Sequence, residues 1–177
     1  MDVNLETGKR IFETVSSGGV GIFRTDVGYA IVGQSAPAIE RIFTHKKRSY
    51  DKPCGCFGSL KMFDELIECS PKARDFVHSV VGVHSLPLSI VGRFRSEHPI
   101  IANADPFTVK HGTKGGTIDL LMNVGPIHNE IARLALESGK GVWGSSANMS
   151  LGGSKYDFDT IEPCLLYTSP SPRDGVL

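Results

Sequence analysis

The sequence has no excess of charge of either sign, because 19 Lys and Arg residues balance 19 Asp and Glu residues. A neutral chain has no global field to hold a polyanion, so any contact with nucleic acid would need a local basic patch. The sequence also shows neither a secretory leader nor an apolar segment of membrane length. Its four cysteines lack paired C-x-x-C spacing. These absences are typical of a reduced, cytoplasmic protein without membrane contact.

The composition is that of an ordinary globular domain, with 177 residues of which 40% are hydrophobic and 21% charged. A chain of this length can bury a substantial core in one domain. The last stretch differs, because residues 164–174 show no amphipathic period and resemble the translated read-through of a sequencing adapter. We therefore place one domain at residues 1–163 and interpret residues 164–177 as a non-native or disordered tail, a native Pro/Ser-rich tail being the alternative.

Helical and strand patterns alternate along the domain, which predicts an α/β fold with a single twisted mixed sheet flanked by helices. Residues 96–116 are rich in His, Pro, Lys and Gly and are predicted to form an exposed loop or a short hairpin. The predicted strands lie at residues 20–23, 29–32, 54–57, 86–94, 117–124 and 142–143, and the predicted helices include residues 38–43, 60–69, 71–81 and 127–138.

Few residues have the spacing of metal ligands. The six histidines are scattered, which favours exposed or capping roles over a metal site. Cys54 and Cys56 would share one face of a strand, so we interpret them as buried core residues and leave a metal site as the alternative. Trp143 lies in an apolar strand and is predicted to belong to the core, not to a base-stacking platform. We assign no metal ligands.

A basic cluster follows the helix predicted at residues 38–43. Lys46, Arg48 and Lys52 have the spacing K-x-R-x-x-x-K, and Pro53 favours an extended backbone at Lys52. Such a cluster suits a polyphosphate, because Arg offers a bidentate fork and Lys a mobile point charge. The alternative is that these cations complete a helix C-terminus, where they are also favourable.

A polar cluster of two hydroxyls and an amide follows the last predicted strand, in the run Ser145-Ser146-Ala147-Asn148. Ligands of open α/β proteins bind at strand ends, so these side chains are candidates for a binding cleft. Ser and Asn also begin turns by bonding their own backbone, which is the alternative. If the cluster and the basic segment form one cleft, Ser146 must lie close to Lys46 and Arg48 although about a hundred residues separate them.

Four motifs in order resemble those of the YrdC-like family, the threonylcarbamoyl-AMP synthases. They are RTDVGYAI at residues 24–31, the K-x-R and K-P pairs at residues 46–53, LPLS at residues 86–89 and SSAN at residues 145–148. The resemblance covers roughly residues 5–163. It implies the condensation of L-threonine, bicarbonate and ATP into threonylcarbamoyl-adenylate with release of pyrophosphate, for modification of a tRNA adenosine. The implied cofactor is Mg²⁺ with ATP, and RNA is a further possible partner.

The resemblance also implies roles for individual residues. The threonine substrate would be bound by Thr25, Lys52 and Ser89, and the nucleotide by Lys46, Arg48, Ser146 and Asn148. Attack of a carbamate on the α-phosphorus needs positioning and charge neutralisation, which cations and Mg²⁺ supply, and it needs no covalent nucleophile. No catalytic residue is therefore assigned.

One departure from the family pattern bears on activity. Leu121 stands near the place where the family carries an arginine that reaches the substrate, and losing such a cation costs orders of magnitude in affinity or rate. Arg93 or Arg95 on a neighbouring strand would be the replacement. The alternative function is a catalytically degenerate YrdC-like module that binds RNA, and a third interpretation is a carbamoyl-transfer domain of a larger maturation protein.

Overall fold

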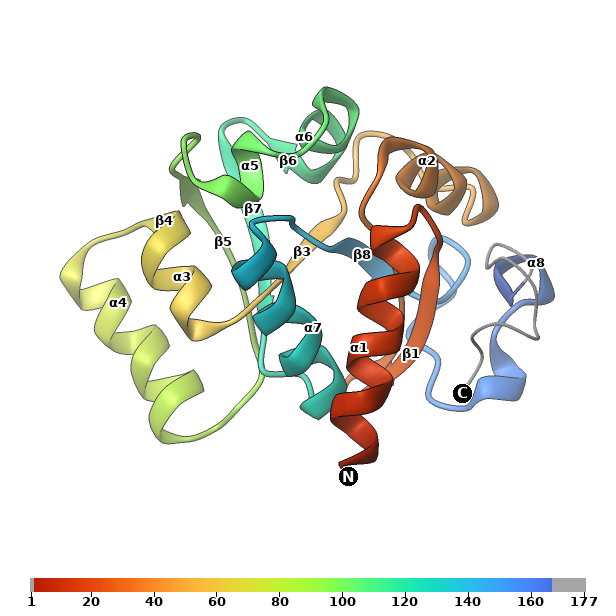
Figure 1. The fold of residues 1–177 in the computed structure, drawn as a ribbon, viewed down its shortest axis with the longest axis horizontal. Coiled ribbons are helices and arrows are strands. Elements are labelled where there is room, and N and C mark those ends of the chain that lie inside the picture. The colour runs from red at the N-terminus through yellow and green to blue at the C-terminus, as the bar shows by residue number, and fades with distance from the viewer. Residues whose placement is uncertain (1, 167–177) are drawn as a thin grey trace.

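The computed structural model describes residues 2–166 and is built on one mixed sheet (Figure 1). The strands follow the spatial order β1-β2-β8-β3-β7-β5-β4, and β6 pairs with β7. Strands β3 and β7 are parallel, and the other pairs are antiparallel. The strands are β1 (Gly21–Thr25), β2 (Gly28–Gly33), β3 (Gly55–Gly58), β4 (Ile67–Glu68), β5 (Leu88–Phe94), β6 (Thr113–Lys114), β7 (Thr117–Met122) and β8 (Trp143–Ser146). The predicted fold class, a single mixed sheet flanked by helices, is confirmed.

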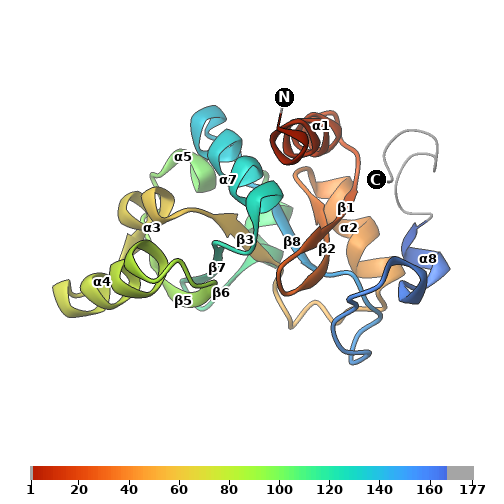
Figure 2. The same ribbon diagram turned by 90° about the horizontal axis from the view of Figure 1, so that it is seen from below.

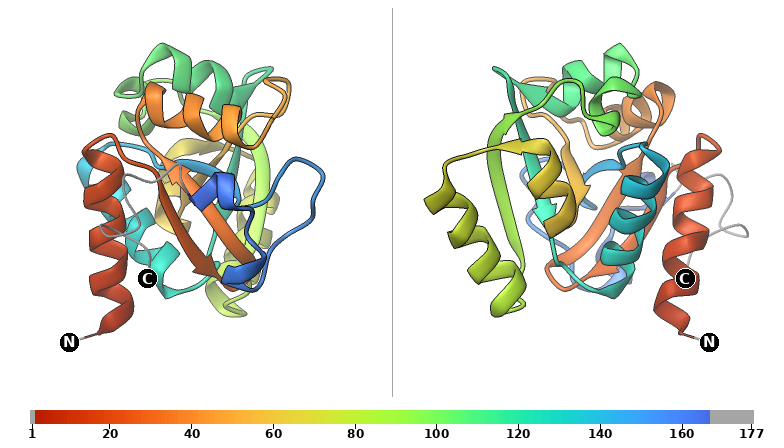
Figure 3. Two further views of the ribbon diagram at one scale, coloured as in Figure 1. Left: turned by 90° about the vertical axis from the view of Figure 1, so that its right-hand side faces the viewer. Right: turned by 60° about the vertical axis from the view of Figure 1, so that its left-hand side comes forward.

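Helices lie on both sides of the sheet. Figure 2 shows α1, α3 and α7 on one side and α2 and α8 on the other, and Figure 3 shows α1 beside α7. The helices are α1 (Val3–Ser16), α2 (Ala36–His45), α3 (Leu60–Leu66), α4 (Pro71–Val77), α5 (Pro99–Ala102), α6 (Pro106–Gly112), α7 (Pro126–Ser138) and α8 (Pro163–Leu166), with a π-helical turn η1 (His78–Val83) and a 3₁₀ turn η2 (Phe158–Thr160).

The segment predicted as a loop or hairpin, residues 96–116, is instead largely helical. It contains α5, α6 and the short strand β6. Both helices begin with a proline that follows a capping side chain: His98 Nδ1 accepts from the Ile100 amide at 3.2 Å, and Asp105 Oδ1 accepts from the Thr108 amide at 2.8 Å. Proline with a capping residue also forms turns, so the same local signals were misinterpreted.

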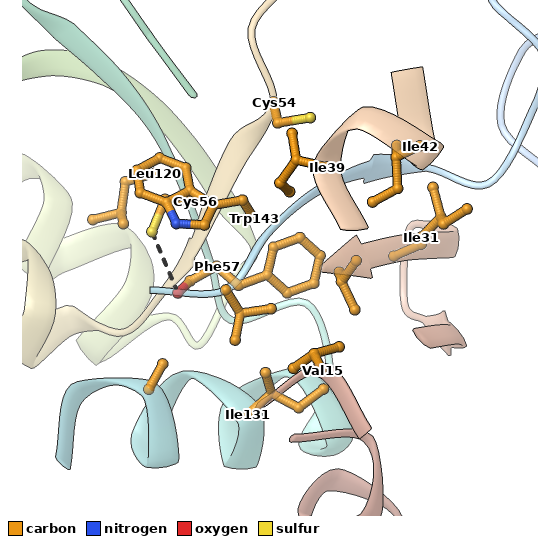
Figure 4. Close-up of a cluster of buried hydrophobic side chains, with 14 of the residues drawn as sticks. Val15, Ile31, Ile39, Ile42, Cys54, Cys56, Phe57, Leu120, Ile131 and Trp143 are labelled. Atoms are coloured by element: carbon orange, nitrogen blue, oxygen red, sulfur yellow. Dashed lines mark hydrogen bonds between the residues drawn. The ribbon is translucent and has the colours of Figure 1, made fainter. Parts of the chain in front are cut away.

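The core lies between the sheet and its covering helices, and Figure 4 shows part of it around Trp143. Cys54, Cys56 and Trp143 are fully buried, as predicted for core residues. Burial raises the pKa of the Cys54 thiol to about 11 and also raises that of Cys56. Both cysteines therefore stay protonated and apolar at neutral pH. Within residues 2–166 no group of three His, Cys, Asp or Glu side chains is placed to hold a metal ion.

His128 on α7 is buried against Phe57, with ring centroids 4.9 Å apart, and burial lowers the pKa of its imidazole to about 4 from 6.5. Between these values an unfolded chain binds a proton that the native protein excludes. The full stability is therefore present above pH 6.5. As the pH falls from 6.5 towards 4, the free energy of unfolding decreases by about 3 kcal/mol. We expect urea denaturation at pH 7 and pH 4.5 to show this loss. A His128→Leu variant with the same acid sensitivity as the parent protein would contradict the assignment.

Residues 163–166 form α8, and Leu165 is buried in the core cluster. Residues 167–177 of the predicted tail lie outside the described residues. Among residues 2–166, the helices are all too short or too polar to cross a membrane.

Candidate functional site

A cleft of about 310 Å³ opens on the sheet over the neighbouring strands β2, β8, β3, β7 and β5. A volume of this size lies at the lower end of the range for small-molecule sites. Four of the residues predicted from motifs line it, from four distant parts of the chain: Thr25, Arg48, Ser89 and Ser146.

Glycines form part of the cleft floor. Gly144 of β8 pairs with Gly55 of β3. On its other side, β3 pairs with β7 so that Cys56 lies beside Leu120, and Gly55 therefore lies beside Asp119. Residues side by side in neighbouring strands point to the same face. A Cβ at Gly55 would lie 3.3 Å from Asp119 Oδ2. Gly55 and Gly144 therefore leave the backbone of the cleft floor uncovered beside the Asp119 carboxylate.

The next row of the floor carries larger side chains. Phe57, Leu121 and Ser89 follow one another across β3, β7 and β5. The Ser89 hydroxyl donates a hydrogen bond to Asp119 Oδ1. Leu121, near the family's arginine position, thus contributes an apolar side chain to the cleft lining.

Arg48 is held rigidly at the cleft by three hydrogen bonds. Its Nε donates to the Lys52 carbonyl at 2.9 Å and its Nη2 to the Pro53 carbonyl at 2.8 Å. Its Nη1 donates to the Ser145 hydroxyl at 3.1 Å. A guanidinium fixed at its base keeps its remaining N–H groups for a ligand and loses little entropy on binding. Among residues 2–166, Arg48 is the one cationic residue that lines the cleft.

Lys46 is only 1% exposed and does not line the cleft. Its ammonium donates to the backbone carbonyls of Ser146 and Asn148. Burial, with a smaller contribution from the charge of Arg48, lowers the pKa of this ammonium to about 8. Lys46 therefore ties α2 to the segment that follows β8, instead of presenting its charge to a ligand.

The structure brings Lys46, Arg48 and Ser146 together, as the sequence analysis required for a shared cleft. Asn148 is buried and does not line the cleft, and its Nδ2 donates to the Met149 carbonyl at 2.6 Å. Lys52 is exposed and does not belong to the lining. The predicted binding roles of Lys46, Lys52 and Asn148 stay predictions. The geometry does not support direct contact between these three side chains and a ligand in the cleft.

Thr25 lines the cleft, but its hydroxyl already has partners in the β1–β2 turn. It donates to the Gly28 carbonyl at 2.5 Å and accepts from the Val27 amide at 3.3 Å. Arg93 and Arg95 do not fill the position near Leu121. Neither lines the cleft, and Arg95 donates to the Glu65 carbonyl at 2.7 Å.

Sequence reasoning missed Asp119 and the role of Ser145. Asp119 is the one carboxylate that the described part of the chain contributes to the cleft lining. Its signal was present, since a lone Asp stands among apolar residues of the strand TIDLLM. A single carboxylate is a weak site for a free Mg²⁺ ion.

Solved structures show the same fold at low sequence identity. A protein from Streptococcus mutans, smu.1377c, superposes with a TM-score of 0.70 at 24% identity, over 90% of this chain and 68% of that one. Sua5 from P. abyssi, in complex with L-threonine, gives 0.64 at 18% identity over 92% and 46%, and E. coli YciO gives 0.63 at 19% identity over 93% and 75%. This chain thus has the Sua5/YciO-like, or YrdC-like, α/β fold.

No protein-family model matches the sequence, and no curated protein matches it. The chain spans less than half the length of the P. abyssi Sua5 chain that it resembles in structure.

Proposed function

We propose that this chain is a nucleotidyltransferase that makes threonylcarbamoyl-adenylate from L-threonine, bicarbonate and ATP for the modification of tRNA. The observation that carries the proposal is Arg48, an arginine fixed by three hydrogen bonds in a cleft assembled from the four motifs. The likeness to a Sua5 structure that contains L-threonine supports the choice of amino acid.

The cleft can serve this chemistry by orientation and charge. A carbamate oxygen bonds to the α-phosphorus, the bond to the bridging oxygen breaks, and pyrophosphate leaves with the electron pair. Arg48 would neutralise phosphate oxygens, and the floor at Gly55 and Gly144 lets a ligand approach the backbone closely. Mg²⁺ would supply further neutralisation of the phosphates, and the Ser146 hydroxyl, which belongs to a residue of the cleft lining, would hold it.

The direct test is pyrophosphate release from ATP by the purified protein with bicarbonate and Mg²⁺. We expect release that depends on L-threonine and on bicarbonate, and a product with the mass of threonylcarbamoyl-adenylate. Release that ignores threonine would reject the synthase assignment.

A second candidate is a degenerate module that binds RNA without catalysis, and the observation in its favour is Leu121 in the cleft lining in place of a cation. Binding of this kind rests on phosphate contacts and falls steeply with salt as counterions are released. Absence of pyrophosphate release together with salt-sensitive binding of tRNA would favour this candidate over the synthase.

A further inference from the structure

A second cavity, of about 250 Å³, lies where β2 passes into α2 and where β8 begins. Its lining includes Gln34 and Ser35 from the β2–α2 junction, and Lys140 and Trp143 from the start of β8. Among residues 2–166, no residue lines both this cavity and the cleft described above. What binds in the second cavity can therefore be tested apart from the proposed function.

The indole of Trp143 is fully buried, yet its Nε1 has no hydrogen-bond partner within residues 2–166 (Figure 4). The nitrogen lies against Gly141, where a Cβ would come within 2.9 Å of it, and Gly141 also lines the cavity. Buried polar groups of native proteins nearly always have a partner. The Trp143 N–H is therefore available to an acceptor on a ligand in this cavity.

The N-terminus of α2 provides further donors at the same cavity. Its N-cap residue, Ser35, lines the cavity and makes no capping hydrogen bond with its side chain. Helix α2 has 10 residues, and the amides and dipole at its start favour a negative charge. Gly33 pairs with Trp143 across β2 and β8, and a Cβ at Gly33 would lie 2.8 Å from the side chain of Ala38 in the first turn of α2. The indole and the helix start are thus neighbours.

Two charged side chains of the described chain line the cavity, and they act in opposite directions. Lys140 is exposed, and its backbone carbonyl accepts from Gln34 Nε2 at 3.1 Å, which fixes its segment beside the start of α2. Asp105 accepts from the Thr108 amide at 2.8 Å and from the Thr108 hydroxyl at 2.7 Å. A monoanion gains from Lys140 and the helix dipole, whereas the charge of Asp105 opposes a ligand with more negative charge, such as a phosphate dianion.

We propose that this cavity is a binding site for a small monocarboxylate. One carboxylate oxygen accepts from the Trp143 indole N–H, and the negative charge lies between Lys140 and the N-terminus of α2. The Ser35 hydroxyl offers a further donor. The cavity volume lies below the range of drug-sized ligands and suits a short organic acid.

The test uses Trp143 as the reporter, because the chain has one tryptophan. A proton–nitrogen correlation NMR spectrum of the isotope-labelled protein therefore contains one indole N–H signal. Lactate replaces chloride at constant ionic strength, and lactamide is the matched uncharged ligand of nearly the same shape. We expect lactate to move the indole signal saturably with a Kd of about 1 to 10 mM. Lactamide and inorganic phosphate are expected to bind about tenfold more weakly or worse.

Three variants locate the ligand. Lys140→Gln removes the charge but keeps a long polar side chain at an exposed position, and we expect it to weaken lactate binding about fivefold or more. Lys72→Gln is the matched control, because Lys72 is an exposed lysine on α4 that does not line the cavity, and it must leave the Kd unchanged. Trp143→Phe removes the N–H donor, and calorimetry should show lactate binding weakened to a similar extent. The thermal unfolding midpoint checks that each variant keeps its fold.

The outcomes also separate this site from the proposed function. An indole signal that does not move with lactate up to about 100 mM overturns the site. Equal binding of lactate and lactamide, or tighter binding of phosphate than of lactate, overturns the assignment to a monocarboxylate. A lactate Kd that Lys140→Gln leaves unchanged overturns the position of the ligand. Lactate binding that meets every expectation supports the site even if the protein releases no pyrophosphate.

Discussion

We expect the replacement of Arg48 with alanine to lower threonine-dependent pyrophosphate release by a factor of about thirty to a thousand. Arg48 is the cation in the cleft lining, and its guanidinium is already oriented by Lys52, Pro53 and Ser145. The loss of one such preorganised contact to a transition state costs about 2 to 4 kcal/mol. The measurement is kcat/KM for ATP in the pyrophosphate assay.

Two further variants make the Arg48 result specific. Arg48→Lys keeps the charge but not the fork of donors, so we expect activity between that of the parent protein and that of Arg48→Ala. Arg10→Ala removes an exposed arginine from α1 and must leave the activity unchanged. If Arg48→Ala keeps more than a third of the activity, the phosphates do not bind at Arg48.

Replacing Lys46 with methionine destabilises the protein and disturbs the segment from Ser145 to Asn148. The change removes the ammonium that donates to the part-buried carbonyl of Ser146 and the buried carbonyl of Asn148. A buried acceptor left without a donor costs about 1 to 3 kcal/mol, so we expect a loss of about 2 kcal/mol or more in the free energy of unfolding. Urea denaturation measures it.

The pH dependence of this loss identifies its cause. The pKa of Lys46 is about 8 in the native protein and 10.5 in an unfolded chain. Between these values the unfolded chain holds a proton that the native protein has released, so the stability of the parent protein rises relative to Lys46→Met as the pH increases from 8 to 10.5. The cysteines are common to both proteins, so their titration largely cancels in this difference. A difference that stays constant or shrinks over this range would contradict the buried position of the ammonium.

The sheet and its core were predictable because the hydrophobic patterns of helices and strands indicate which side chains are buried. Cys54, Cys56 and Trp143 lie in short apolar strands, and burial of an apolar side chain depends little on which neighbour covers it. The helices of residues 99–112 were missed because capping residues and prolines serve helices and turns alike. Local chemistry alone does not decide between the two.

The candidate site was predictable only in part: Thr25, Arg48, Ser89 and Ser146 line the cleft, whereas Lys46, Lys52 and Asn148 do not. The K-x-R spacing places Lys46 and Arg48 on one segment, yet the chain turns between them, with Lys47 in the left-handed region at a φ of 48°. Lys46 consequently points inward to backbone carbonyls and Arg48 towards the cleft. The lone Asp in the strand TIDLLM marked Asp119 as unusual, but its place in the cleft depends on the register between β3 and β7, which the local sequence does not determine.

A crystal structure of the protein with a non-hydrolysable ATP analogue and Mg²⁺ tests the central claim most directly. We expect the nucleotide in the cleft, with its phosphates in contact with Arg48. A nucleotide bound elsewhere on the molecule, with the cleft empty, would contradict the account.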